Sequence, residues 1–96
     1  MERARAELDR LAGLILRGTT AEEAVTLAWP LVCGKRIAQS TRALRLEGQE
    51  LVVEVPDRAW RTELASYLPH YLHQLKKTTG VEVETVRFVV GHEKSR

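Results

Sequence analysis

Apolar residues in the first third of the chain recur every three or four positions, which is the spacing of amphipathic helices. The range Arg3–Arg17 has this pattern and is followed by Gly18, a natural C-terminal stop. Thr20 and Glu23 have the spacing of a capping box, in which each side chain bonds the backbone amide of the other residue. The pattern therefore predicts one helix over residues 3–17 and a second helix that begins at Ala21.

The second predicted helix has one apolar face and meets two helix-breaking residues near its end. Trp29 lies on the apolar face, and a side chain of this size is usually well buried. Pro30 has no amide donor, so we expect it to kink or restart the helix, and we expect Gly34 to break it. The range Lys35–Ser40 then has the length of a further short helical turn.

A β-hairpin is predicted next, because apolar and polar residues alternate over two short runs. Gly48 and Gln49 lie between the runs and supply the turn. The alternation places five residues on one apolar face: Leu44, Leu46, Leu51, Val53 and Val55. Val52 falls on the opposite, exposed side of the hairpin, and an edge strand there is open to pairing with a second chain.

A third helical region is predicted from the cap residue Asp57 to about Thr79, where Gly80 ends it. Pro69 lies inside this region and either kinks one long helix or splits it into two helices, with the proline in the first turn of the second. Trp60 shares a broad apolar stripe with residues four and seven positions further on. We therefore expect Trp60 to pack over the sheet as part of the core.

The last predicted strand contains Val86, Phe88 and Val90 in clean alternation, whereas the valines within residues 81–83 are out of phase with them. This predicts a bulge or a late strand start near Thr85. The predicted elements follow the order α-α-β-β-α(α)-β, which indicates an α+β fold with a small three-stranded sheet and helices packed on one face.

We expect residues 1–96 to form a single domain, with residues 91–96 as a flexible tail. Five residues are the predicted structural core: Trp29, Gly34, Trp60, Leu64 and Phe88.

The formal net charge is +2, and the positive excess lies in the middle of the chain. Residues 35–77 hold eight Lys or Arg and five acidic residues, whereas residues 1–34 have a net charge of −1 and residues 78–96 a net charge of zero. A basic middle permits a polyanionic partner without requiring one.

Eight cations are the candidate nucleic-acid-binding residues: Lys35, Arg36, Arg42, Arg45, Arg58, Arg61, Lys76 and Lys77. If they converge, they form a surface that follows phosphates and binds them weakly, with strong salt dependence and without sequence preference. The alternative is a solvated surface with local ion pairs, such as Arg58 with Glu54 or Arg61 with Asp57.

The chain contains no catalytic or cofactor motif such as a P-loop, HExxH, GxSxG or a glycine-rich dinucleotide turn. Cys33 is the only cysteine, and its neighbours favour a small buried hydrophobe over a reactive thiol. His70 and His73 lie three positions apart and make at most half of a zinc site. We therefore expect no enzymatic activity, no metal and no cofactor.

No apolar run approaches the ~20 residues that a membrane-spanning helix needs. The first ten residues, MERARAELDR, are charged and contain no apolar block of the kind that a signal peptide has. We therefore expect a cytoplasmic protein without a membrane partner.

Five landmarks follow one another along the chain: Trp29-Pro-Leu-Val-Cys-Gly34, Ile37-Ala38, Leu51-Val-Val-Glu-Val55, Trp60 with Leu64, and Val86-Arg87-Phe88. In their order and spacing they resemble the bacterial DciA family over roughly residues 8–90. The resemblance implies a fold similar to a type II KH domain, with the order α-β-β-α-α-β. It also implies a helicase operator or loader that binds DNA and contacts the replicative helicase DnaB.

With this resemblance we expect a non-enzymatic accessory protein of DNA replication that contacts DnaB and binds single-stranded DNA weakly. The chain lacks the G-x-x-G loop with which KH domains clamp a nucleic-acid backbone. The alternative is a generic KH-like binder of single-stranded RNA or DNA without a helicase role. A third hypothesis is an interaction module, present as a monomer or a weak homodimer.

Overall fold

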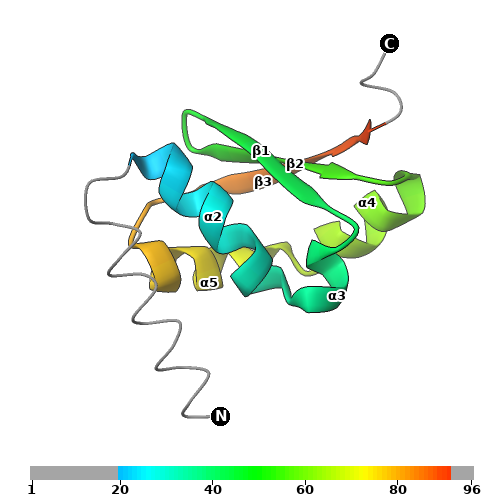
Figure 1. Ribbon diagram of the computed structural model, residues 1–96, viewed down its shortest axis with the longest axis horizontal. Coiled ribbons are helices and arrows are strands. Elements are labelled where there is room, and N and C mark those ends of the chain that lie inside the picture. The colour runs from blue at the N-terminus through cyan, green and yellow to red at the C-terminus, as the bar shows by residue number, and fades with distance from the viewer. Residues whose placement is uncertain (1–19, 92–96) are drawn as a thin grey trace.

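The computed structural model describes residues 20–91, which form a three-stranded sheet with helices on one face (Figure 1). The predicted helix over residues 3–17 and most of the predicted tail lie outside the described residues. The described elements are α2 (Ala21–Cys33), α3 (Lys35–Ala38), β1 (Arg42–Glu47), β2 (Glu50–Val55), α4 (Arg58–Ala65), α5 (Leu68–Thr79) and β3 (Thr85–Val90). The strand order is β1-β2-β3, with β1 antiparallel and β3 parallel to the central β2. The predicted α+β fold class is confirmed.

Helix α2 begins with the predicted capping box. Thr20 Oγ1 accepts a hydrogen bond from the Glu23 amide, and Glu23 Oε1 accepts one from the Thr20 amide, each at 3.1 Å. The predicted restart at Pro30 is wrong, because α2 continues through this residue to Cys33. Trp29 and Cys33 are buried on either side of the proline, and their packing holds the last turn in helical form. Gly34, with φ of +91°, then ends α2.

The hairpin has the predicted turn but contains a bulge that changes which residues of β1 face the core. Ala43 lies opposite Val53, whereas Arg45 lies opposite Val52, so Leu44 is an extra residue on β1. Ala43 packs against the core, as Leu46 does beyond the bulge. The prediction that strict alternation places Leu44 on the core face is therefore wrong.

Val52 is fully buried, although the alternation predicts an exposed position on the outer face of the sheet. It lies on the central strand between Arg45 of β1 and Arg87 of β3. The Arg87 guanidinium bonds Glu47 at 2.9 Å and Glu50 at 3.1 Å, so the arginine stem extends over the sheet. Long charged side chains cover apolar surface in this way while their ends stay in water.

The third helical region consists of two helices, so Pro69 splits it rather than kinking it. Pro69 lies in the first turn of α5, where a missing amide donor costs no hydrogen bond within the helix. Asp57 caps α4 by accepting a hydrogen bond from the Trp60 amide at 3.0 Å. Gly80 ends α5 in the left-handed conformation, and β3 begins at Thr85, which confirms the predicted late start.

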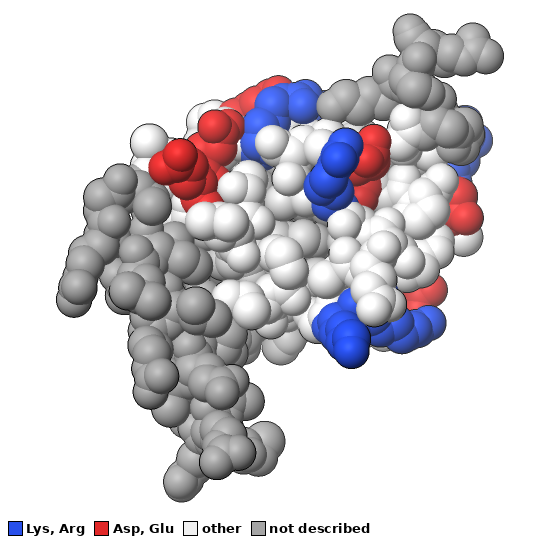
Figure 2. All heavy atoms as spheres, viewed as in Figure 1, with Lys and Arg blue, Asp and Glu red and all other residues white. Residues whose placement is uncertain are grey.

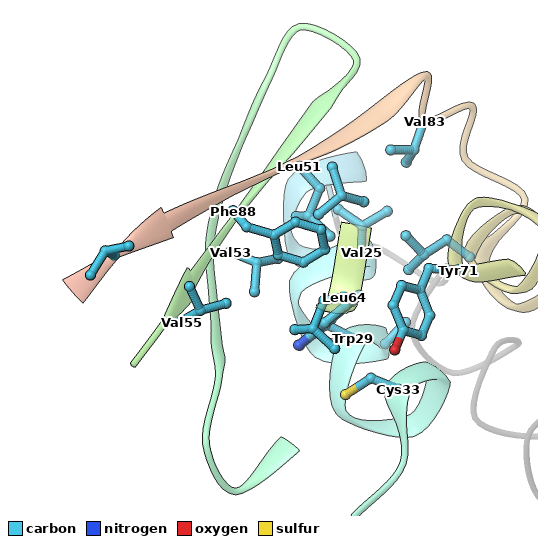
Figure 3. Packing of buried hydrophobic residues seen from close by; sticks show 14 residues of the cluster. Val25, Trp29, Cys33, Leu51, Val53, Val55, Leu64, Tyr71, Val83 and Phe88 are labelled. Carbon is cyan, nitrogen blue, oxygen red and sulfur yellow. The ribbon is translucent and has the colours of Figure 1, made fainter. Parts of the chain in front are cut away.

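Trp29 lies at the centre of the core, where it contacts several elements (Figure 3). Its ring meets that of Tyr71 edge-on, with 5.1 Å between centroids, and that of Phe88 at 6.3 Å. Its Nε1 donates a hydrogen bond to Thr41 Oγ1 at 3.0 Å, and Thr41 Oγ1 donates to the Ile37 carbonyl at 2.9 Å. Trp29 therefore connects α2 with α5, with β3 and with the segment between α3 and β1.

The predicted structural core residues have three different surroundings. Leu64 and Phe88 are buried in the same cluster as Trp29. Trp60 is only half-buried and packs against the edge of this cluster. Gly34 is exposed, and its structural role is the positive φ that separates α2 from α3.

We predict that Thr41→Val lowers the free energy of unfolding by about 1–3 kcal/mol, because the buried Trp29 indole N–H loses its acceptor. The measurement is chemical denaturation followed by tryptophan fluorescence. Thr62→Val on the exposed side of α4 is the matched control and is expected to change stability by less than about 0.5 kcal/mol. Equal effects of the two substitutions would contradict the prediction.

Candidate functional site

Two of the eight candidate cations lie on the outer face of the sheet and are paired with carboxylates. Arg42 lies 3.7 Å from Glu54 on the neighbouring strand. Arg45 donates a hydrogen bond to Glu47, and Arg87 forms an ion pair with the same carboxylate. The hydrogen bond from Arg45 is the largest of the effects that lower the pKa of the Glu47 carboxyl. On the outer face of the sheet, arginines therefore alternate with carboxylates, and this face does not carry charges of one sign only.

The other six candidates are divided among three helices. Lys76 and Lys77 lie in the last turn of α5, where Lys76 pairs with Glu82. Lys35 and Arg36 form the first half of the short helix α3, and both are exposed. The remaining two, Arg58 and Arg61, are exposed on α4.

The structure does not bring all eight cations to one surface. Figure 2 shows one side of the molecule, on which Lys and Arg side chains lie at separate places, with acidic side chains beside several of them and uncharged residues between. The α5 lysines and the sheet arginines belong to different elements from the cations of α3 and α4. The other four candidates lie on α3 and α4, and these two helices lie at the same end of the molecule (Figure 1).

A cleft of about 430 Å³ lies at this same end, between α2 and α3 on one side and α4 and α5 on the other. On α4 the lining residues are Trp60, Glu63 and Leu64, whose three- and four-residue spacing places them on one face of the helix. The lining residues are Val32, Cys33, Arg36, Ile37, Trp60, Glu63, Leu64, Tyr67, His70 and Tyr71. The lining is mixed: aliphatic and aromatic side chains alternate with the ionisable side chains of Arg36, Glu63 and His70, which come from three different helices.

Trp60 lines this cleft and also packs against the edge of the core. The prediction that its whole side chain packs over the sheet is therefore only partly right. Leu64, one turn further along α4, is 2% exposed and occupies the position that faces the core. Trp60 lies in the first turn of the helix, so only part of its ring reaches the cluster. Tyr67, at the other end of the same stripe, is 51% exposed.

Cys33 and Tyr71 form the buried floor of the cleft. Burial raises the pKa of the Cys33 thiol from its ordinary value of 9.0 to about 11. The thiol lies 3.6 Å from the Gly34 carbonyl, which accepts its weak hydrogen bond. Burial also raises the pKa of the Tyr71 hydroxyl. A protonated, buried thiol is a poor nucleophile.

Among residues 20–91, no group of three or more His, Cys, Asp or Glu side chains has the arrangement of a metal site. His70 lines the cleft, whereas His73 is exposed one turn later on α5. No helix within the described part of the chain is long and apolar enough to cross a membrane.

Sequence reasoning missed the cleft because it assigned the whole stripe of the third helical region to the core. Two features of the sequence point to the cleft: the apolar stripe is wider than one core-facing side needs, and Gly34 interrupts the preceding helix. A glycine break between α2 and α3 turns the chain, so that α3 stands opposite α4 instead of extending α2.

The described residues thus form a small α+β fold with a cleft of mixed lining and exposed cations at the same end. The chain matches the family described as "Dna[CI] antecedent, DciA" over residues 5–88, and it belongs to this family. Nearly the whole chain is covered by the match, which confirms the resemblance seen in the sequence. No curated protein matches the chain. The DciA family is associated with loading of the DnaB helicase in bacterial DNA replication and is not known as a family of enzymes.

We predict that the native protein reacts with iodoacetamide at pH 8 at least about a hundredfold more slowly than the urea-unfolded chain. The two-unit rise in the Cys33 pKa lowers the thiolate fraction by that factor. Because the folded pKa is the higher one, the unfolded chain releases this proton first. The free energy of unfolding is therefore expected to fall as the pH rises from about 9 to about 11.

Cys33→Ala is the control, since it removes this thiol and its share of the pH dependence while leaving the other ionisable groups. Equal alkylation rates in the native and unfolded states would show that the thiol is accessible and contradict the burial described above.

Proposed function

We propose that this protein is a non-enzymatic accessory factor of DNA replication that binds the replicative DnaB-type helicase in the bacterial cytoplasm. The observation that carries the proposal is membership of the DciA family over residues 5–88. When the short helix α3 is left out, the described order of elements is α-β-β-α-α-β. This is the order expected of a KH-like domain and agrees with a role beside nucleic acid.

Weak binding of single-stranded DNA is the second part of the proposal. The cations of α3 and α4 support it, because they are exposed and lie at one end of the molecule. Lys76 and Lys77 at the end of α5 remain candidates for a separate contact. Arg42 and Arg45 are weaker candidates, because a phosphate would have to replace their carboxylate partners.

We predict that the full chain binds its cognate DnaB-type helicase with a Kd of about 1 μM or lower at low salt. Sedimentation velocity with a labelled helicase measures the complex, and an unrelated hexameric ATPase is the control. Failure to form a complex at about 10 μM, with folding verified by circular dichroism, would remove the helicase role.

We predict that Lys35→Ala reduces the salt dependence of binding to an oligothymidylate. Removing one cation that neutralises a phosphate lowers the slope of log affinity against log salt by about 0.7 for a single strand. Arg45→Ala, which removes a paired cation of the same charge, is expected to change the slope less. Fluorescence anisotropy at four salt concentrations measures both, and identical slopes for all three proteins would exclude Lys35 from the nucleic-acid contact.

A further inference from the structure

The hydroxyl of Tyr71 is a buried polar group without a hydrogen-bond partner among residues 20–91. The side chain is 4% exposed and contacts the rings of Trp29, Tyr67 and His70. In Figure 3 its oxygen lies at the end of the ring near Cys33, and both residues line the cleft. A buried hydroxyl is normally paired, so an unpaired one that lines a cleft indicates that something else supplies its partner.

The walls of the cleft indicate what kind of group enters it. Ile37 and Val32 are half-buried on one side, and Trp60 is half-buried on the other. These side chains already pack against the core at one edge and leave the remaining apolar surface facing the cleft. A side chain with an apolar body and a polar tip therefore fits, with its body between the walls and its tip at the Tyr71 hydroxyl.

The charges of the lining favour a polypeptide over a nucleic acid. Arg36 stands on the α3 wall, whereas Glu63 stands on the α4 wall. A strand of nucleic acid needs one sign of charge along its path, and Glu63 would repel its phosphates. A protein surface carries both signs and can oppose each group with its complement around a central apolar anchor.

We propose that this cleft receives one large side chain with a polar tip, of the tyrosine or tryptophan type, from a segment of the helicase. This inference rests on the proposed function and deepens it by locating the contact. The volume, about 430 Å³, suits a single anchor side chain with part of its backbone rather than a whole helix. The anchor supplies the hydrogen-bond partner that the Tyr71 hydroxyl does not find among residues 20–91.

The decisive substitution is Tyr71→Phe, which removes only the hydroxyl. In the free protein this oxygen has no partner among the described residues, so the denaturation midpoint is expected to stay unchanged or to rise. Affinity for the full-length DnaB-type helicase is expected to fall about five- to tenfold, because the bound state loses a hydrogen bond. A purely structural tyrosine would lose stability and affinity together.

A second pair of variants tests the apolar rim without relying on the hydroxyl. Tyr67→Ala removes an exposed aromatic side chain from the cleft and is expected to weaken helicase binding about tenfold or more. Leu27→Ala is the matched control, because Leu27 is 57% exposed on α2 and does not line the cleft. The affinity of Leu27→Ala for the helicase is expected to stay within about twofold of that of the unsubstituted protein.

The outcomes separate this inference from the proposed function. If the original protein binds the helicase and neither cleft variant weakens binding, the cleft is not the contact and the accessory role stands. If the original protein does not bind, both proposals are overturned. If Tyr71→Phe and Tyr67→Ala weaken binding to oligothymidylate but not to the helicase, the occupant is a nucleobase and the polypeptide assignment is wrong.

Discussion

The hydrogen bond from the Trp29 indole to Thr41 is the contact on which the arrangement of the helices depends. The Thr41 hydroxyl accepts this bond and donates a second one to the Ile37 carbonyl. One hydroxyl just before β1 therefore connects α2 with α3. The other edges of the indole meet Tyr71 and Phe88. Because these groups come from distant parts of the chain, a single side chain determines how α2 and α3 lie against α5 and the sheet.

The cleft follows from this constraint. Gly34 turns the chain at the end of α2, and the bond from Thr41 to Ile37 keeps α3 close to the segment that enters β1. Helix α3 therefore lies across the cleft from α4, and Ile37 packs against the edge of the core while remaining half-buried. The buried residues Cys33, Leu64 and Tyr71 fill the base of the space between the helices, and a cleft with a mixed lining remains above them.

Much of the fold was predictable from local signals, because caps, glycine stops and alternation act over a few residues. The capping box at Thr20, the split at Pro69 and the start of β3 are of this kind. The bulge at Leu44 and the burial of Val52 were not predictable, because both depend on which strands flank each other. The candidate cations were identifiable by type, but their separation depends on tertiary structure, which residue spacing does not reveal.

Trp60 shows why a periodic apolar stripe does not by itself distinguish core from binding surface. Spacing places Trp60, Leu64 and Tyr67 on one helical face, yet Leu64 is buried while Tyr67 is half-exposed. Leu64 lies in the last turn of α4, which packs on the cluster, whereas Trp60 lies in the first turn and Tyr67 lies beyond the helix, at the N-cap of α5. Residues at the ends of such a stripe keep apolar surface in contact with water, which is costly unless a partner covers it. A single apolar stripe can thus contain both core residues and residues that line an open cleft.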